Sequence, residues 1–165
     1  MKKKNQKKQK KIVVMVSGGF DPVHPGHINY FREAKKLGDE LVVIINNDHW
    51  IHSKKGHGFM SAKDRALVIA AFRYVDRVII SKHNKNTKDM SVSKEILALK
   101  PDIFANGGDR NEKDAKNPKS SLYKDVEMCK RLGVKMVFNT GHDKKMLSSS
   151  KLLKQYLKKY SRGKK

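Results

Sequence analysis

Short apolar runs rich in β-branched residues alternate along this chain with longer segments of helical periodicity. Five runs have the length and composition of strands, at residues 12–16, 41–45, 77–80, 102–105 and 135–138. This alternation is typical of parallel strands joined by crossover helices. We therefore expect an α/β fold: a small doubly wound, Rossmann-like parallel sheet of about five strands, with helices on both faces.

The segments between these runs carry helix start and stop signals. Gly38 ends the first of them, and Ser61 with Asp64 forms a capping box at the start of the second. The expected helices cover residues 26–37, 61–72, 91–99 and 122–132, and a last helix follows the serine run 148–150. The polar stretch 111–121 is expected to be an exposed loop.

A length of 165 residues is enough for one ordinary globular domain. We place it at residues 12–160, between a lysine-rich tail at 1–11 and a basic tail at 161–165. The longest apolar runs fall far short of the roughly 18 to 20 residues that span a bilayer, so no membrane association is expected. The single cysteine, Cys129, excludes an internal disulfide and favours a reducing compartment, so the expected location is the cytoplasm.

The formal net charge of +22 lies mostly at the two ends of the chain. Residues 2–11 carry seven lysines and residues 151–165 carry seven Lys or Arg, with no acidic residue in either segment. The body at 12–150 keeps 24 basic and 16 acidic residues, a net charge of +8. The 1–11 tail has no apolar residue to bury after Met1, so we expect it to be disordered and not a secretory signal. The tails have two interpretations: they reflect solubility or a lysine-biased genome, or they are arms that bind a polyanion.

The turn after the first apolar run is the strongest candidate site, because ligands of α/β folds bind outside the carboxyl ends of the strands. It contains Gly18 and Gly19, which let the backbone approach a ligand closely. The helix that begins near Pro25 offers unpaired N–H groups to an anion, and His24 and His27 can both point at that anion. The turn therefore predicts a phosphate site.

Other interpretations of this turn fit less well. The glycine patterns of a dinucleotide fold and of a P-loop are both absent, although Asp48 follows the second strand. His24 and His27 have a spacing that could ligate a metal, but no third ligand lies close by in the sequence. The remaining alternative is that the two histidines are purely structural and bind no ligand, but this leaves the glycines unexplained.

The run from Gly19 to His27 resembles the G-x-F-D-x-x-H-x-G-H signature of the small cytidylyltransferase-like nucleotidyltransferases. That family includes glycerol-3-phosphate cytidylyltransferase and the adenylyltransferase that activates heptose 1-phosphate. Further segments occur in the order that such enzymes show: Asp64-Arg65, Tyr74-Val75-Asp76, Gly107-Gly108-Asp109 and Ser148-Ser149-Ser150. The resemblance covers residues 13–156.

The resemblance implies an enzyme in which a substrate phosphate attacks the α-phosphorus of a nucleoside triphosphate and pyrophosphate leaves. His24 and His27 would stabilise the charge that develops on the phosphates. A lysine in the loop after the second strand, Lys54 or Lys55, would contact the phosphates, unless both are simply solvated. Arg65 would hold this end of the site together, unless it is a surface arginine.

The resemblance also implies a nucleotide-binding surface. Its residues would be Gly18, Gly19, Phe20 and Asp21 in the first turn, Gly107, Gly108, Asp109 and Arg110 after the fourth strand, and Ser148, Ser149 and Ser150 at the last helix. A plain turn is the alternative for the glycine segment. Ordinary helix capping is the alternative for the serines.

Two departures from the cytidylyltransferase pattern leave the substrate open. An arginine expected before the serine run is missing, and His142 or Lys144 would have to replace it. A tryptophan expected after the glycine-aspartate motif is Arg110 here, and the glycine motif is closer to the heptose-phosphate adenylyltransferases. We expect CTP or ATP with Mg²⁺, leaning to CTP, and a phosphorylated sugar, polyol or similar small alcohol as acceptor.

Partners other than substrates are also implied. Members of the family are commonly dimers, so the resemblance implies a homodimer. The sequence has no cluster of carboxylates of the kind that would predict a metal site built by the protein alone. The alternative from another functional class is a nucleic-acid-associated protein that acts through its lysine-rich tails.

Overall fold

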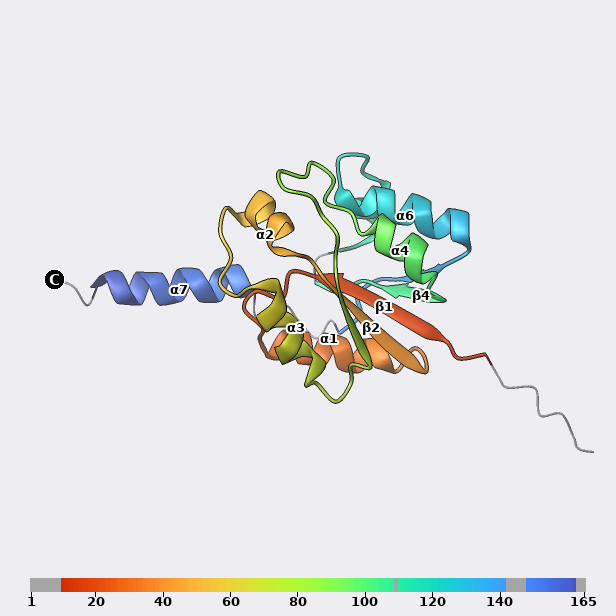
Figure 1. Cartoon of the computed structure of the whole chain (residues 1–165), viewed down its shortest axis with the longest axis horizontal. Helices are drawn as coiled ribbons and strands as arrows, with labels where there is room; N and C mark the ends of the chain where they lie inside the picture. The colour runs from red at the N-terminus through yellow and green to blue at the C-terminus, as the bar shows by residue number, and fades with distance from the viewer. Residues whose placement is uncertain (1–9, 109, 142–147, 163–165) are drawn as a thin grey trace, which may run out of the picture.

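A computed structural model describes residues 10–108, 110–141 and 148–162 (Figure 1). Its centre is a five-stranded parallel sheet in the order β3-β2-β1-β4-β5. The strands are β1 (Val13–Gly18), β2 (Glu40–Ile45), β3 (Arg77–Ile80), β4 (Ile103–Ala105) and β5 (Lys135–Val137). The expected doubly wound α/β fold is confirmed.

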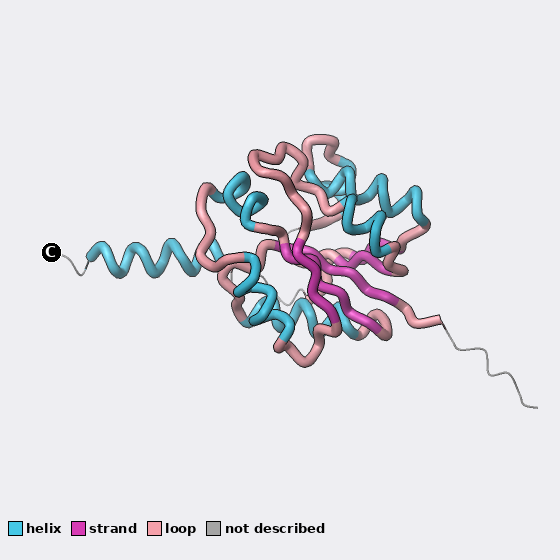
Figure 2. Tube along the Cα trace, viewed as in Figure 1, coloured by secondary structure: helices cyan, strands magenta, loops and turns pink. Residues whose placement is uncertain are grey.

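The helices cover the sheet on both faces. They are α1 (Pro25–Lys35), α2 (Asp48–Lys55), α3 (Ala62–Ala70), α4 (Ser93–Leu99), α5 (Glu112–Lys116), α6 (Ser121–Leu132) and α7 (Ser149–Arg162). In Figures 1 and 2, α1 and α3 lie on one side of the strands and α4 and α6 on the other, while α7 projects away from the body.

Strand β2 shows how the sequence divides the core in two. Leu41, Val43 and Ile45 pack into one apolar cluster, and Val42 and Ile44 into the other. All five side chains are fully buried. A continuous apolar run is what a parallel strand covered on both faces requires.

Helix α2 corrects one expectation. Lys54 and Lys55 lie in its last turn, and not in a loop after the second strand. Asn47 caps the helix by accepting the N–H of Trp50 through its side-chain oxygen, and Gly56 ends it in the left-handed conformation. These two capping residues define the ends of a helix whose apolar periodicity is weak.

Two smaller differences concern other segments. The stretch expected as the loop 111–121 contains the short helix α5, which Asn111 caps through hydrogen bonds from Lys113 and Asp114. Strand β1 continues to Gly18, so the glycine turn starts at the very end of the strand.

The remaining expectations about the chain's surroundings concern its ends and its apolar segments. Residues 1–9 and 163–165 of the expected tails lie outside the described residues. Within the described ranges, no helix is long and apolar enough to cross a membrane. Cys129 is a free, buried thiol, and burial raises its pKa to about 12.

Candidate active site

A pocket of about 280 Å³ opens at the carboxyl edge of the sheet, where β1 lies between β2 and β4. The chain order reverses at this point of the sheet, which is where open α/β folds bind ligands. The lining residues are Ser17, Gly18, Gly19, Phe20, His27, Tyr30, Asn46, Trp50, Met90, Val92, Asn106, Gly107, Gly108, Arg110, Ser121, Leu122 and Asp125.

The first turn forms one wall of this pocket. A Cβ at Gly18 would come within 2.8 Å of the Phe20 ring, and a Cβ at Gly19 within 2.8 Å of the Ile51 side chain. Phe20 has a positive φ of 49° and packs edge-on against His27, with the ring centroids 5.0 Å apart. Glycine at 18 therefore leaves room for the Phe20 ring, and glycine at 19 leaves room for Ile51.

His24 and His27 lie together at the start of α1, as expected, with their ring centroids 3.7 Å apart. The backbone N–H of His24 donates to Nδ1 of His27 at 3.2 Å. Burial, together with the nearby His24 and Lys55, lowers the pKa of His27 to about 3. A neutral ring whose Nδ1 accepts a hydrogen bond carries its proton on Nε2, so His27 faces the pocket as a neutral donor.

His24 is buried and, unlike His27, is not among the residues that line the pocket. It is 8% exposed, and burial lowers its pKa. Its Nδ1 has no hydrogen-bond partner within the described ranges. A buried nitrogen without a partner is costly in the unliganded protein.

The two lysines of α2 differ in position. The Lys55 ammonium donates to the backbone carbonyl of Asp21 at 3.2 Å, and burial lowers its pKa. Lys54 is exposed. The structure therefore brings Lys55 to the first turn and leaves Lys54 in solvent.

Asp21 ties the first turn to the loop before α3. Its carboxylate accepts the backbone N–H groups of Phe59 and Met60, both at 2.8 Å. The side chain is 1% exposed. Both of its oxygens are engaged by the protein's own backbone, which fixes the shape of the turn.

Arg65 is fully buried, so it is not a surface arginine. Its guanidinium donates to the carbonyls of Gly19 and Asn46, both at 2.7 Å, and to that of Met60 at 3.2 Å. It also pairs with Asp48 at 2.7 Å. Arg65 thus joins the ends of β1 and β2 to the start of α2, and it is a positioning residue beside the pocket rather than part of its lining.

The segment after β4 forms the opposite wall. A Cβ at Gly107 would collide with the Tyr30 ring at 2.7 Å, whereas a Cβ at Gly108 would meet nothing within 4 Å. The constraint at Gly108 is its φ of +71°. Arg110 donates to the hydroxyls of Ser120 and Ser121, both at 3.2 Å. Asp109 lies outside the described residues.

The serine run begins α7 near the first turn, although it does not line the pocket. Ser149 is buried and donates to the carbonyl of Pro22 at 2.9 Å. The Ser148 hydroxyl accepts the N–H of Lys151, as a capping residue does. Ser150 is exposed.

Three polar residues of the pocket were not expected from the sequence. Asn46 and Asn106 directly follow β2 and β4, and both are at most 5% exposed. Asp125 lies on the inner face of α6 and accepts the N–H of Val92 at 2.8 Å. Burial raises the pKa of Asp125 to about 8. Two signals in the sequence could have indicated these residues. The asparagines directly follow predicted strands, and Asp125 is a charged residue within an apolar helix face.

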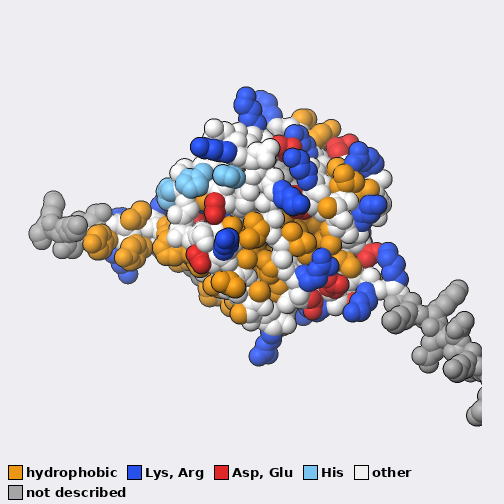
Figure 3. Space-filling view, in the orientation of Figure 1, with side chains coloured by type: hydrophobic (Ala, Val, Ile, Leu, Met, Phe, Trp, Pro, Cys, Tyr) orange, Lys and Arg blue, Asp and Glu red, His pale blue; other side chains and the backbone are white. Residues whose placement is uncertain are grey.

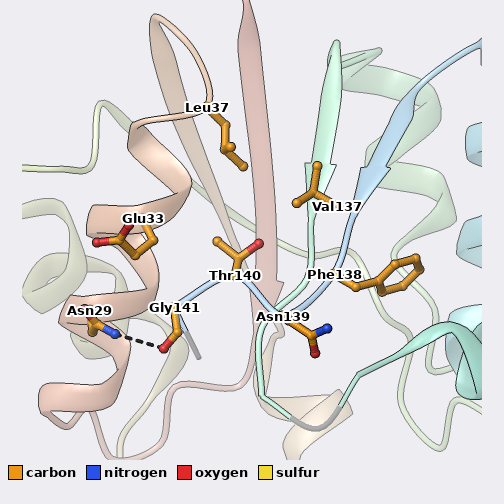
Figure 4. Close-up of a pocket in the computed structure, with 8 residues that line it drawn as sticks. All are labelled: Asn29, Glu33, Leu37, Val137, Phe138, Asn139, Thr140 and Gly141. Carbon is orange, nitrogen blue, oxygen red and sulfur yellow. Dashed lines mark hydrogen bonds between the residues drawn. The ribbon is translucent and has the colours of Figure 1, made fainter. Parts of the chain in front are cut away.

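A second hollow, of about 410 Å³, lies between α1 and the segment that follows β5 (Figure 4). Asn29 donates to the carbonyl of Gly141 at 2.9 Å and so joins its two sides. Thr140, which lines it, keeps a buried hydroxyl without a partner within the described ranges. His142 and Lys144, the proposed replacements for a missing arginine, lie outside the described residues.

A resident metal would need a group of ligands. Within the described residues, no three His, Cys, Asp or Glu side chains gather closely enough to hold an ion. The donors around the pocket are neutral amides, hydroxyls and an imidazole, together with Lys55 and Arg110. This set suits the phosphates of a metal-nucleotide complex better than a bare cation.

Comparison with known proteins identifies the family of this chain. The profile of the cytidylyltransferase-like family matches residues 15–155. The FAD synthase of Archaeoglobus fulgidus is 33% identical over 146 residues, which cover 88% of this chain and 98% of that protein. The FAD synthase of Pyrococcus horikoshii is 40% identical over 124 residues, or 73% and 80% of the two chains.

Two further relatives carry other names. The bifunctional protein HldE of Helicobacter pylori is 41% identical over 104 residues, 62% of this chain and 21% of that protein. A solved structure described as a lipopolysaccharide core biosynthesis protein of Thermoplasma volcanium has a TM-score of 0.63 and 33% identity, and the match covers 81% of this chain and all of that one. The chain belongs to the cytidylyltransferase-like family, and it is a nucleotidyltransferase.

Proposed function

We propose that this protein transfers AMP from ATP to the phosphate of FMN, forming FAD and pyrophosphate. An FMN phosphate oxygen attacks the α-phosphorus of ATP, and the bond between that phosphorus and the bridging oxygen to the β-phosphate breaks. The observation that carries the proposal is the near full-length similarity to proteins named FAD synthase. This similarity favours ATP over CTP, the nucleotide that the overall sequence pattern favours.

The first turn supplies the chemistry that this reaction needs. The Nε2–H of His27 and the N–H groups at the start of α1 are donors to the charge that develops on the phosphate oxygens. Lys55 adds a positive charge at the same turn. Mg²⁺ carried by the triphosphate would neutralise further charge on its oxygens. Arg65 and Asp21 hold the turn in shape, and the serine run places α7 beside it.

The pocket wall suits a flat heterocycle as acceptor. Trp50, Met90 and Leu122 contribute apolar surface, while Asn46 and Asn106 contribute amide groups. Ligand pockets typically combine a mainly apolar lining with a few placed polar groups. The adenine of ATP and the isoalloxazine ring of FMN are both planar with polar edges, and either ring matches this combination better than a polyol does.

A phosphorylated sugar is the second candidate acceptor. Similarity to HldE and to a lipopolysaccharide core biosynthesis protein favours it. Asn46, Asn106 and the nearby Asp125 could also bond to sugar hydroxyls. Under this alternative the reaction class is unchanged and only the acceptor differs.

One assay separates these candidates. Pyrophosphate release is measured with each of the four ribonucleoside triphosphates against FMN and a panel of phosphorylated sugars and polyols, and FAD is identified by chromatography. We expect release only with ATP and FMN together. Release with a sugar phosphate and not with FMN would replace the first candidate by the second, and release with CTP alone would overturn ATP.

Two variants complete the design. His27→Ala is compared with His57→Ala, a matched change of an exposed histidine outside the pocket. Removal of residues 1–11 tests the nucleic-acid alternative. A nucleotidyltransferase keeps its turnover without that tail, whereas a tail-driven binder loses its affinity for nucleic acid and its steep salt dependence.

A further inference from the structure

Two asparagines line the pocket at corresponding places in the sheet. Asn46 directly follows β2 and Asn106 directly follows β4, and these two strands lie on either side of β1. Their exposed fractions are only 4% and 5%. Asparagine side chains are mostly exposed in folded proteins, so two buried ones beside one pocket require a physical reason.

The backbone of each asparagine is already hydrogen-bonded at the edge of the sheet. The N–H of Asn46 donates to the carbonyl of Gly18 at 2.9 Å, and its carbonyl accepts from Arg65 at 2.7 Å. The N–H of Asn106 donates to a carbonyl of β5 at 2.7 Å, and its carbonyl accepts the N–H of Thr140 at 3.0 Å. These bonds fix the points from which the two side chains start.

Each side chain keeps one buried amide atom without a hydrogen bond. Among the residues that the structure describes, neither Oδ1 of Asn46 nor Nδ2 of Asn106 has a partner. By contrast, the exposed histidines of α2, in pale blue in Figure 3, lie at the surface, where water can bond to them. Native proteins almost always give a buried amide atom a partner, because leaving it unpaired is destabilising. The two atoms therefore call for a ligand in the pocket.

The two free atoms have opposite hydrogen-bonding character. Oδ1 of an asparagine accepts a hydrogen bond and Nδ2 donates one. A ligand that satisfies both must offer one donor and one acceptor. The pyrimidine part of an isoalloxazine ring does so, because its N3–H group lies between two carbonyl groups.

We propose that Asn46 and Asn106 are specificity-determining residues that bind this edge of the FMN ring. Asn46 accepts the N3–H group, and Asn106 donates to a neighbouring carbonyl oxygen. This inference rests on the proposed function, and it assigns the choice of acceptor to two particular side chains.

The size of the pocket favours the flavin ring over adenine, which also carries a donor beside an acceptor. The pocket measures about 280 Å³, close to the lower limit of about 300 Å³ for pockets that hold drug-sized ligands. Its apolar lining includes Trp50, Met90, Val92 and Leu122. The benzenoid part of isoalloxazine would cover more of this apolar surface than the smaller adenine ring.

A flavin analogue tests the contact with Asn46. Methylation at N3 removes the donor from the ring and leaves the phosphate unchanged. FMN and N3-methyl-FMN are titrated separately into the protein, and binding is measured by calorimetry. We expect the wild type to bind N3-methyl-FMN at least tenfold more weakly than FMN. Asn46→Ala, which lacks the acceptor and leaves room for the methyl group, should bind the two flavins within twofold of each other.

Steady-state kinetics test the contact with Asn106. We expect Asn106→Leu to raise the KM for FMN at least tenfold and the KM for ATP less than twofold. Its melting temperature should not fall below that of the wild type, because the change removes an unpaired buried amide. The matched control is Asn84→Leu, a change of an exposed asparagine outside this pocket, which should alter neither KM.

The contrary results separate this inference from the proposed function. Equal binding of FMN and N3-methyl-FMN by the wild type would overturn the contact with Asn46. A higher KM for ATP alone in Asn106→Leu would assign that residue to adenine, and a lower melting temperature with unchanged KM values would assign it a structural role. All three results overturn the inference while turnover of ATP and FMN, and with it the proposed function, stands. Absence of turnover with FMN overturns both.

Discussion

Replacing Arg65 by lysine tests whether this buried side chain positions the active-site turn. The guanidinium makes hydrogen bonds to Gly19, Asn46 and Met60 and an ion pair with Asp48, all from a side chain with no exposed surface. Lysine keeps the charge but has one ammonium in place of the planar fork. It cannot reach three carbonyls that approach from three different segments.

The magnitude follows from the bonds lost. Two of the three carbonyls lose a charge-assisted donor, and each such loss costs about 1.5 to 3 kcal/mol; the lower value applies here because only the contact to Asn46 is fully buried. The pair with Asp48 adds little, because that carboxylate is 50% exposed. We therefore predict that Arg65→Lys lowers the free energy of unfolding by about 3 kcal/mol, or the melting temperature by roughly 6 to 12 °C.

Chemical and thermal unfolding measure this change. Arg77→Lys is the matched control, because Arg77 is 52% exposed and makes one surface ion pair with Glu40. Its free energy of unfolding should change by less than about 0.5 kcal/mol. Equal unfolding free energies for Arg65→Lys and the control would refute the positioning role, since that role rests on bonds lysine cannot make.

Three further changes probe the pocket. His27→Ala should lower turnover in the pyrophosphate assay at least a hundredfold, because it removes a preorganised donor whose loss typically costs about 3 to 4 kcal/mol. Lys55→Ala should lower turnover far more than Lys54→Ala, because only Lys55 reaches the first turn. Asp125→Asn should gain stability over the wild type at pH 8 but not at pH 4, by up to about 5 kcal/mol, because the free energy changes by about 1.36 kcal/mol per pH unit between the pKa values of 3.8 and about 8. The folded state keeps a proton on Asp125 up to a pKa of about 8, so the contribution of this carboxyl to wild-type stability falls as pH rises from about 4 to about 8. Unfolding midpoints at the two pH values measure this difference.

Each of these three predictions has a result that would contradict it. Wild-type turnover in His27→Ala would remove the first turn from the reaction. Equal loss in the two lysine variants would show that position relative to Asp21 is irrelevant. An unchanged pH dependence in Asp125→Asn would show that the carboxyl is ionised in the folded protein. Circular dichroism of each variant confirms that the fold is retained.

Most of the sheet could be predicted because its determinants are local. The β-branched runs predicted the ends of every strand to within two residues. The first turn was recognisable because its glycines and histidines lie close together in the chain. Helix α2 escaped because only Trp50 and Ile51 are buried in it, too few for a periodic pattern. Its capping residue Asn47 and the terminal Gly56 were readable signals.

The pocket itself was less predictable because its members come from separate elements. Asn46, Asn106 and Asp125 meet only after three crossovers bring β2, β4 and α6 to one edge. Arg65 could be assigned to this end of the site by resemblance, but its partners are backbone carbonyls, which no side-chain pattern reveals. Sequence therefore identified the first turn, predicted as a phosphate site, together with Gly107, Gly108 and Arg110 of the opposite wall, and missed the polar residues that other elements bring to the pocket.

Two ionisable groups that line the pocket, His27 and Asp125, exchange protons in opposite directions when the protein unfolds. On unfolding, His27 returns from a pKa of about 3 toward 6.5 and takes up a proton, while Asp125 returns from about 8 toward 3.8 and releases one. Between about pH 4 and pH 6.5 the uptake and the release cancel. Unfolding then exchanges no net proton at these two groups, so their combined contribution to stability does not change with pH. Below that window the imidazole alone makes stability fall with acid, and above it, up to about pH 8, the carboxyl alone makes stability fall with base. The contribution of these two groups to the folding equilibrium is therefore insensitive to pH between about 4 and 6.5.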